Sequence, residues 1–71
     1  MNVTSAQVKK ILTGSQTYTQ LGFSMMITRL KGIYSKSPSP ETLQKCTDEI
    51  NTFLVKFASI MATDFAIVSK L

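Results

Sequence analysis

The 71-residue chain contains no histidine, no tryptophan and a single cysteine, Cys46. A disulfide within the chain is therefore excluded, and a serine or cysteine nucleophile would have no imidazole to activate it. Beyond that cysteine, only four carboxylates, those of Glu41, Asp48, Glu49 and Asp64, are available to hold a metal. We therefore expect a protein that is not an enzyme and that has no catalytic residues, no cofactor and no metal site.

Charged residues and long apolar runs are also scarce. Only 17% of the residues are charged, against about 25% in average soluble chains. The longest stretch without charge, Ile11 to Thr28, is interrupted by threonine, glycine, serine and glutamine, whereas a transmembrane helix needs about 20 mostly apolar residues. No basic start followed by an apolar run indicates a secretory signal. Together with the lone cysteine, this favours a cytoplasmic protein without a transmembrane segment.

A chain of this length forms one domain, which we place at residues 1–71. One core of this size rarely supplies more than ~3–5 kcal/mol of net stability, so small proteins usually add disulfides, a metal or a partner. Since the first two have no support in the composition, we expect a protein partner or a second copy of the chain.

The strongest interruption of helical pattern is Ser37-Pro38-Ser39-Pro40-Glu41. Prolines end a preceding helix and push the residue before them to extended geometry. The same residues start a new helix well, with Ser39 as N-cap, Pro40 in the first turn and Glu41 at the positive end of the dipole. We predict a first helix at about 5–35, a turn at 36–40 and a second helix at about 40–70. So short a turn implies antiparallel neighbours.

The fold predicted is thus all-α, an antiparallel two-helix hairpin. The first helix should begin at Thr4 or Ser5 as N-cap, and Gly14 either leaves it continuous, kinks it or breaks it. In the last case residues 5–13 form a short third helix, which could fold back on the other two as a three-helix monomer.

The second helix carries a heptad seam, in which apolar residues recur at alternating spacings of three and four. Its members are Leu43, Cys46, Ile50, Phe53, Phe57, Ile60, Ile67 and Leu71, with Asp64 as the one polar position. We expect this seam to form the interface within the hairpin, and Cys46 to be a small core residue.

A second apolar stripe runs beside this seam, formed by Leu54, Ala58, Met61, Phe65 and Val68. The first helix is apolar around much of its circumference. One hairpin cannot hide all of this surface, and a contiguous exposed apolar patch marks an interaction site. The residues that we predict to bind a partner are Leu54, Met61, Phe65 and Val68 on the second helix, and Phe23, Met26, Ile27 and Leu30 on the first.

Two charged residues lie among these apolar positions. Arg29 is level with Asp48 in the hairpin, with Glu49 and Thr52 nearby, so an Arg29–Asp48 pair is reasonable; the alternative is that Arg29 reaches solvent. A polar residue in a seam can set register or oligomeric state. Asp64 could act in this way as a buried residue of the seam. We favour instead the interpretation in which the two helices splay at their open end and the Asp64 carboxylate is hydrated.

Charge is distributed unevenly along the chain. Residues 1–40 contain Lys9, Lys10, Arg29, Lys31 and Lys36 and no acidic residue. A basic segment of this kind could attract an acidic protein or the surface of an anionic membrane. Nucleic acid is an unfavoured partner, because the basic residues are scattered and no nucleic-acid-binding motif is present.

The layout of an apolar helix, a proline-containing turn and a heptad helix resembles the small helical-hairpin proteins of type III secretion systems. Pro38-Ser39-Pro40 is similar to the turn of the needle subunit, and Pro40-Glu41 to the start of the second helix in the needle co-chaperone. The resemblance covers roughly residues 16–71. It implies a co-chaperone that shields an apolar partner, because the C-terminal half is more apolar than in needle subunits. The alternatives are a self-assembling needle-like subunit and a membrane-active cationic helical protein.

Overall fold

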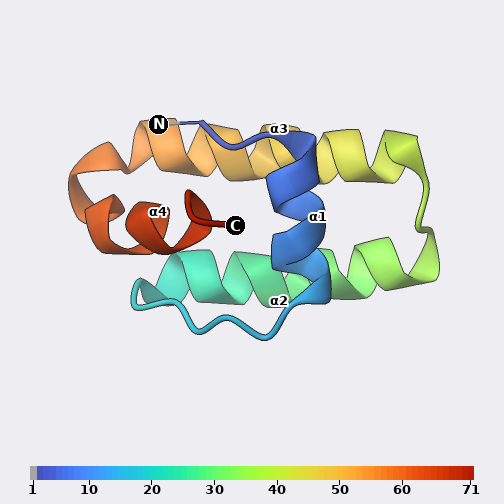
Figure 1. Cartoon of the computed structure of the whole chain (residues 1–71), viewed down its shortest axis with the longest axis horizontal. Helices are drawn as coiled ribbons and strands as arrows, with labels where there is room; N and C mark the ends of the chain where they lie inside the picture. Colours follow the sequence, from blue (N-terminus) through green and yellow to red (C-terminus); the bar gives the residue numbers. More distant parts are fainter. Residues whose placement is uncertain (1) are drawn as a thin grey trace.

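The computed structural model describes residues 2–71, and this part of the chain forms helices and no strands. The elements are α1 (Ser5–Thr13), α2 (Leu21–Lys36), α3 (Pro40–Lys56), a 3-10 turn η1 (Ala58–Ile60) and α4 (Ala62–Val68) (Figure 1). The all-α class predicted from the sequence is confirmed. The chain is not, however, a simple two-helix hairpin, because both predicted helices are divided.

Side-chain caps define the starts of the first three helices. Thr4 and Gln7 form a reciprocal capping box at α1. Gln20 accepts a hydrogen bond from the Phe23 amide at the start of α2. Ser39 caps α3 by accepting from the amide of Thr42, and Pro40 occupies the first turn, as predicted.

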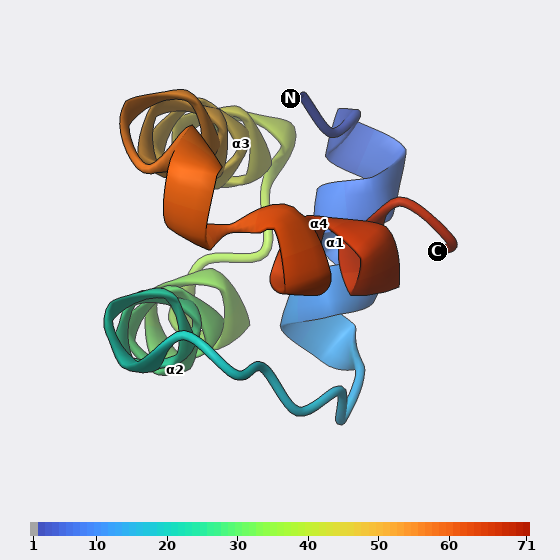
Figure 2. The same ribbon diagram turned by 90° about the vertical axis from the view of Figure 1, so that its left-hand side faces the viewer.

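The helices α2 and α3 run in opposite directions along the long axis of a molecule measuring 31 × 20 × 19 Å (Figure 1). The helix α1 crosses both of them at a steep angle, while α4 lies near the end of the molecule away from the turn that joins α2 to α3 (Figures 1 and 2). Residues from all four helices therefore share one core.

The first predicted helix is interrupted at Gly14, so that residues 5–13 form a separate helix. A Cβ atom on Gly14 would lie 2.7 Å from the main-chain oxygen of Lys10, which is too close for any real Cβ. The chain beyond Gly14 is extended. Residues 5–13 thus form the short N-terminal helix of the alternative prediction and pack on α2 and α3, but the chain also has a fourth helix, α4, which that alternative did not include.

The second predicted helix ends at Lys56 rather than continuing to residue 70. After η1 the chain turns back and α4 packs on the core (Figure 2). The physical reason is burial, because Met61, Asp64 and Val68 become almost completely inaccessible to water in this arrangement. Tertiary packing has overridden a pattern that locally favours one long helix.

Four aromatic rings connect the elements on either side of these breaks. Tyr18 packs edge-on against Phe23, with ring centroids 5.1 Å apart. Phe23 contacts Phe53, which in turn contacts Phe57 at the end of α3. This row of rings fixes the loop before α2 against the C-terminal part of α3.

The segment before α1 is held on α3 by one side chain. The Asn51 side-chain oxygen accepts from the amide of Val3 at 2.7 Å, and its amide group donates to the Val3 carbonyl at 3.0 Å. Val3 is buried as a result.

Candidate protein-binding surface

The side chains that the sequence assigned to a partner lie mainly in the core of the chain itself. Those buried are Leu54, Met61, Val68, Phe23, Met26, Ile27 and Leu30, while Phe65 is half-buried against the same core. The return of α4 and the crossing of α1 cover the surface that a two-helix hairpin would leave open. In this fold these residues pack against one another within the chain.

The heptad seam does not form the central interface as predicted. Its N-terminal members Cys46 and Ile50 are buried, but Ile60 is 53% exposed. Towards the end of α3 it is Leu54, from the second stripe, that faces the core. The exchange begins before the bend at Phe57, because Leu54 follows Cys46 and Ile50 at spacings of four and lies on their side of α3.

Asp64 is buried rather than hydrated, which corrects the sequence interpretation. One carboxylate oxygen accepts from the amide of Thr19 at 2.7 Å and from its hydroxyl at 2.9 Å. The other accepts from the amide of Gln20 at 2.8 Å. The carboxylate thus joins α4 to the residues just before α2, where the positive end of the helix dipole favours a negative charge.

Two further titratable side chains are buried, Tyr18 near Asp64 and Cys46 on α3. Burial and the nearby carboxylate of Asp64 raise the pKa of Tyr18. Its hydroxyl has no hydrogen-bond partner within the described chain. Burial, and secondarily Glu49, also raise the pKa of the Cys46 thiol. Cys46 is a core residue, as predicted, and its thiol is therefore held in its less nucleophilic, protonated form.

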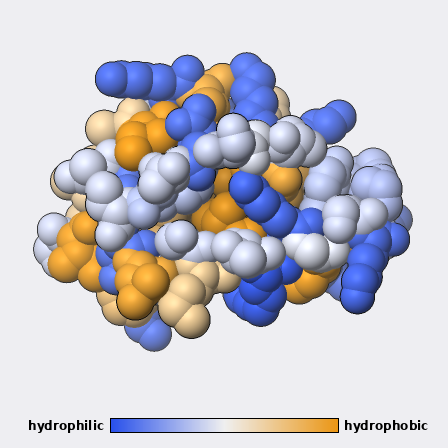
Figure 3. Space-filling model, turned by 90° about the horizontal axis from the view of Figure 1, so that it is seen from below, coloured by the Kyte–Doolittle hydropathy of each residue, from blue (hydrophilic) through white to orange (hydrophobic). Residues whose placement is uncertain are grey.

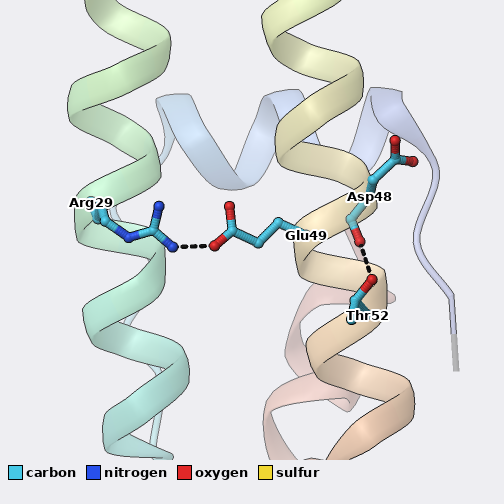
Figure 4. Close-up of polar contacts among 4 residues, drawn as sticks. All are labelled: Arg29, Asp48, Glu49 and Thr52. Carbon is cyan, nitrogen blue, oxygen red and sulfur yellow. Dashed lines mark hydrogen bonds and ion pairs between the residues drawn. The ribbon is translucent and has the colours of Figure 1, made fainter.

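Arg29 pairs with Glu49 and not with Asp48. Figure 4 shows Arg29 reaching from α2 towards Glu49 on α3, while Asp48 points away from α2. Asp48 instead accepts a hydrogen bond from Gln44 at 2.8 Å, and its main-chain oxygen accepts from Thr52. The Arg29–Glu49 pair is well exposed, so we expect it to contribute only about 0.2–1 kcal/mol.

The outer face of α2 exposes large apolar side chains. Leu21 is 72% exposed and Met25 is 64% exposed. At spacings of four, three and four they are followed by Thr28 and Gly32, both exposed, so the four residues form one stripe along the helix. We call these residues the α2 stripe. From below, hydrophobic surface appears as separate patches between polar ones rather than as one continuous face (Figure 3).

Gly32 has no packing role within the chain. A Cβ atom placed on it would meet nothing within 4 Å. On a helix, a glycine can let a neighbouring helix approach closely. For Gly32 the fold provides no such neighbour, because its side of the helix faces water.

The charges near the α2 stripe are basic. The helix contains Arg29, Lys31 and Lys36 and no acidic residue. Lys31 donates to the main-chain oxygen of Gly14 at 2.8 Å, and Arg29 contacts Glu49. Lys36 lies in the last turn of the helix.

Other chemistry has little support in the described part of the chain. Within residues 2–71, no group of three or more His, Cys, Asp or Glu side chains comes together that could hold a metal ion. A shallow groove beside α3 is lined by mixed polar and apolar side chains, namely Asn2, Asp48, Asn51, Thr52, Val55 and Lys56. Among the helices of residues 2–71, none combines the length and apolar character needed to cross a membrane.

Comparison with known proteins gives no relative from which a role could be transferred: no family model, no curated protein and no solved structure matches the chain.

Proposed function

We propose that this chain is a non-enzymatic assembly subunit whose α2 stripe binds an acidic, amphipathic helix of a partner protein. The observation that carries the proposal is the exposure of Leu21 and Met25 in line with Gly32. A helix that lays its apolar face on such a stripe would remove both large side chains from water, which stabilises a complex in proportion to the area buried.

Gly32 supports a helical partner in particular. Glycine in a helix interior costs about 0.5–1 kcal/mol relative to alanine. The chain's own packing does not require this glycine, since an added Cβ would meet open space. Small residues at a contact let two helices approach closely, as the packing of a second helix across α2 would require.

Charge determines which kind of helix fits. With three basic residues and no acid on α2, a second copy docking through the same face would bring like charges together. A partner helix with glutamate or aspartate beside its apolar face would be attracted instead, and its rate of association would fall with added salt.

Within this class we propose a small cytoplasmic co-chaperone of a type III secretion system, which keeps an apolar, helical partner soluble. The support is the resemblance in the turn, where Pro38-Ser39-Pro40 leads into a helix that starts with Pro40-Glu41. A needle-like subunit that assembles with itself and a membrane-active helical protein are the competing functions.

Co-expression with the products of neighbouring genes, followed by size exclusion, tests the proposal. We expect a soluble complex of defined stoichiometry that Met25→Glu abolishes. Val55→Glu is the matched control, because Val55 is a similarly exposed apolar residue on α3. Gly32→Leu should also disrupt the complex while leaving the chain folded.

Three outcomes would contradict the proposal. Filaments formed by the purified chain would favour the needle-like function, and leakage of anionic liposomes would favour the membrane-active one. A complex that Met25→Glu and Val55→Glu weaken equally would mean that binding does not depend on the α2 stripe.

A further inference from the structure

The bend between α3 and α4 contains no residue that breaks helices. Residues 57–61 are Phe, Ala, Ser, Ile and Met, without glycine or proline. No residue within residues 2–71 has a positive φ. An uninterrupted helix from α3 through α4 is therefore compatible with every side chain at the bend, which we call the hinge (57–61).

Few backbone rotations separate the bent form from a continuous helix. Phe57 has φ −116° and ψ 35°, and Met61 has φ −101° and ψ 3°. An α-helix needs about −63° and −42°, which each residue can reach without crossing a forbidden region. Neither η1 nor α4 has a side-chain cap at its start, so straightening the hinge would replace uncapped ends with regular helical hydrogen bonds.

The helix α4 fills a site of well-defined chemistry on the rest of the chain. Met61 and Val68 enter the core completely, and Asp64 satisfies the amides of Thr19 and Gln20. Two contacts extend the site to α1: Lys10 donates to the Leu71 main-chain oxygen at 2.6 Å, and Gln7 donates to that of Ser69 at 3.4 Å.

We propose that the chain forms a domain-swapped dimer in which the hinge straightens and α4 of each copy occupies the α4 site of the other. The occupant must present an apolar side chain, a carboxylate three residues later and a second apolar side chain four residues after that. The same segment of a second copy meets these requirements, because the hydrogen bonds of Asp64 to Thr19 and Gln20 and the burial of Val68 reform between the copies. Exchange of identical elements is a low-cost route to a dimer for this reason.

The heptad seam supports the same conclusion. Its three-and-four spacing continues through the hinge without a change of register, from Phe53 through Phe57 and Ile60 to Asp64. In the bent form this continuity serves no interface, and Ile60 remains 53% exposed. In the swapped dimer the hinge is helical, and only in this conformation does the heptad seam form one continuous stripe from α3 into α4.

Sedimentation or light scattering of the purified chain tests the exchange. We expect a dimer whose fraction increases when the chain is unfolded and refolded at high concentration, because exchange requires α4 to leave its site. Ser59→Pro should weaken dimerisation at least about a hundredfold, because proline in a helix interior removes a hydrogen bond and clashes with the preceding turn. Ser59 is exposed in the 3-10 turn, so the bent monomer should tolerate this change.

Ser59→Ala is the matched control at the same position. Alanine has the higher helix propensity, so this variant should dimerise as strongly as the parent or more strongly. A chain that remains monomeric after refolding at high concentration, or a dimer that Ser59→Pro leaves intact, overturns the proposal.

A cross-linking experiment distinguishes exchange from simple docking. One copy carries Gln7→Cys and the other Ser69→Cys, and the mixture is refolded and treated with a short thiol-reactive linker. In the swapped dimer these positions lie together between chains, so a covalent heterodimer is expected, and Ser59→Pro in both copies should abolish it. A dimer without this cross-link overturns the exchange. The α2 stripe takes no part in this dimer, so Met25→Glu should leave the cross-link unchanged, and the two proposals can fail separately.

Discussion

Asp64 illustrates how one residue can connect distant parts of a small chain. Its two carboxylate oxygens accept three hydrogen bonds from Thr19 and Gln20, in the loop that leads into α2. A buried charge is unfavourable unless such partners satisfy it. The carboxylate therefore selects the conformation in which α4 and this loop are in contact.

Replacing Asp64 with asparagine should destabilise the fold. The amide group would face an amide donor of the loop, so at least one buried N–H would lose its acceptor, at a cost of about 1–3 kcal/mol or more. Urea denaturation followed by circular dichroism measures the change. Asp48→Asn is the control, because Asp48 is exposed and its substitution should change stability by less than about 0.5 kcal/mol. Equal effects of the two substitutions would mean that Asp64 is not buried.

Residue chemistry alone could indicate that Asp64 is unusual but not what it binds. A carboxylate in a seam of apolar residues is visible in the sequence. Two of its three donors are main-chain amides, which every residue except proline carries, and they lie 44 and 45 positions away. The same limit applies to Arg29, whose level in a hairpin predicts α3 as its neighbour but does not distinguish Glu49 from Asp48.

At the scale of the helices, the starts could be predicted better than the ends. Thr4 and Ser39 are caps that act on amides two or three residues away, so the signal is local. The end of α3 depends instead on burying Met61 and Val68 against residues far away in sequence. No residue of the hinge indicates locally that α3 ends there.

Gly14 ends α1 for a local steric reason, and this can be tested. In Gly14→Ala the new Cβ would lie 2.7 Å from the Lys10 main-chain oxygen, so the backbone would have to shift. We expect a loss of about 1–3 kcal/mol of stability in thermal or urea denaturation.

Gly32→Ala is the opposite case. Its Cβ would meet nothing within 4 Å, and alanine is the better helix former, so we expect a gain of about 0.5–1 kcal/mol. If Gly32→Ala destabilises the chain as Gly14→Ala does, the space around Gly32 is not open as this fold has it.

At the scale of the whole molecule, one sequence fits two ways of hiding its apolar surface. A hairpin with a long second helix exposes one of its two stripes and requires a partner. The observed fold instead divides both helices and encloses side chains from α1, α2, α3 and α4 in a single core. Part of the surplus apolar surface predicted from the sequence is thereby internal, and the α2 stripe and Val55 are among what remains outside.

Truncation of two side chains, one before the hinge and one within it, distinguishes these arrangements. In the bent fold Leu54 is completely buried and Ile60 is 53% exposed. Leu54→Ala should therefore cost about 2–5 kcal/mol, as for other buried leucines, whereas Ile60→Ala should cost less than about 1 kcal/mol. Urea denaturation at a protein concentration low enough to keep the chain monomeric measures both. In a long-helix hairpin built on the seam the order would be reversed, because Ile60 would lie in the interface and Leu54 on the outer stripe. A larger loss for Ile60→Ala than for Leu54→Ala would therefore contradict the folded-back position of α4.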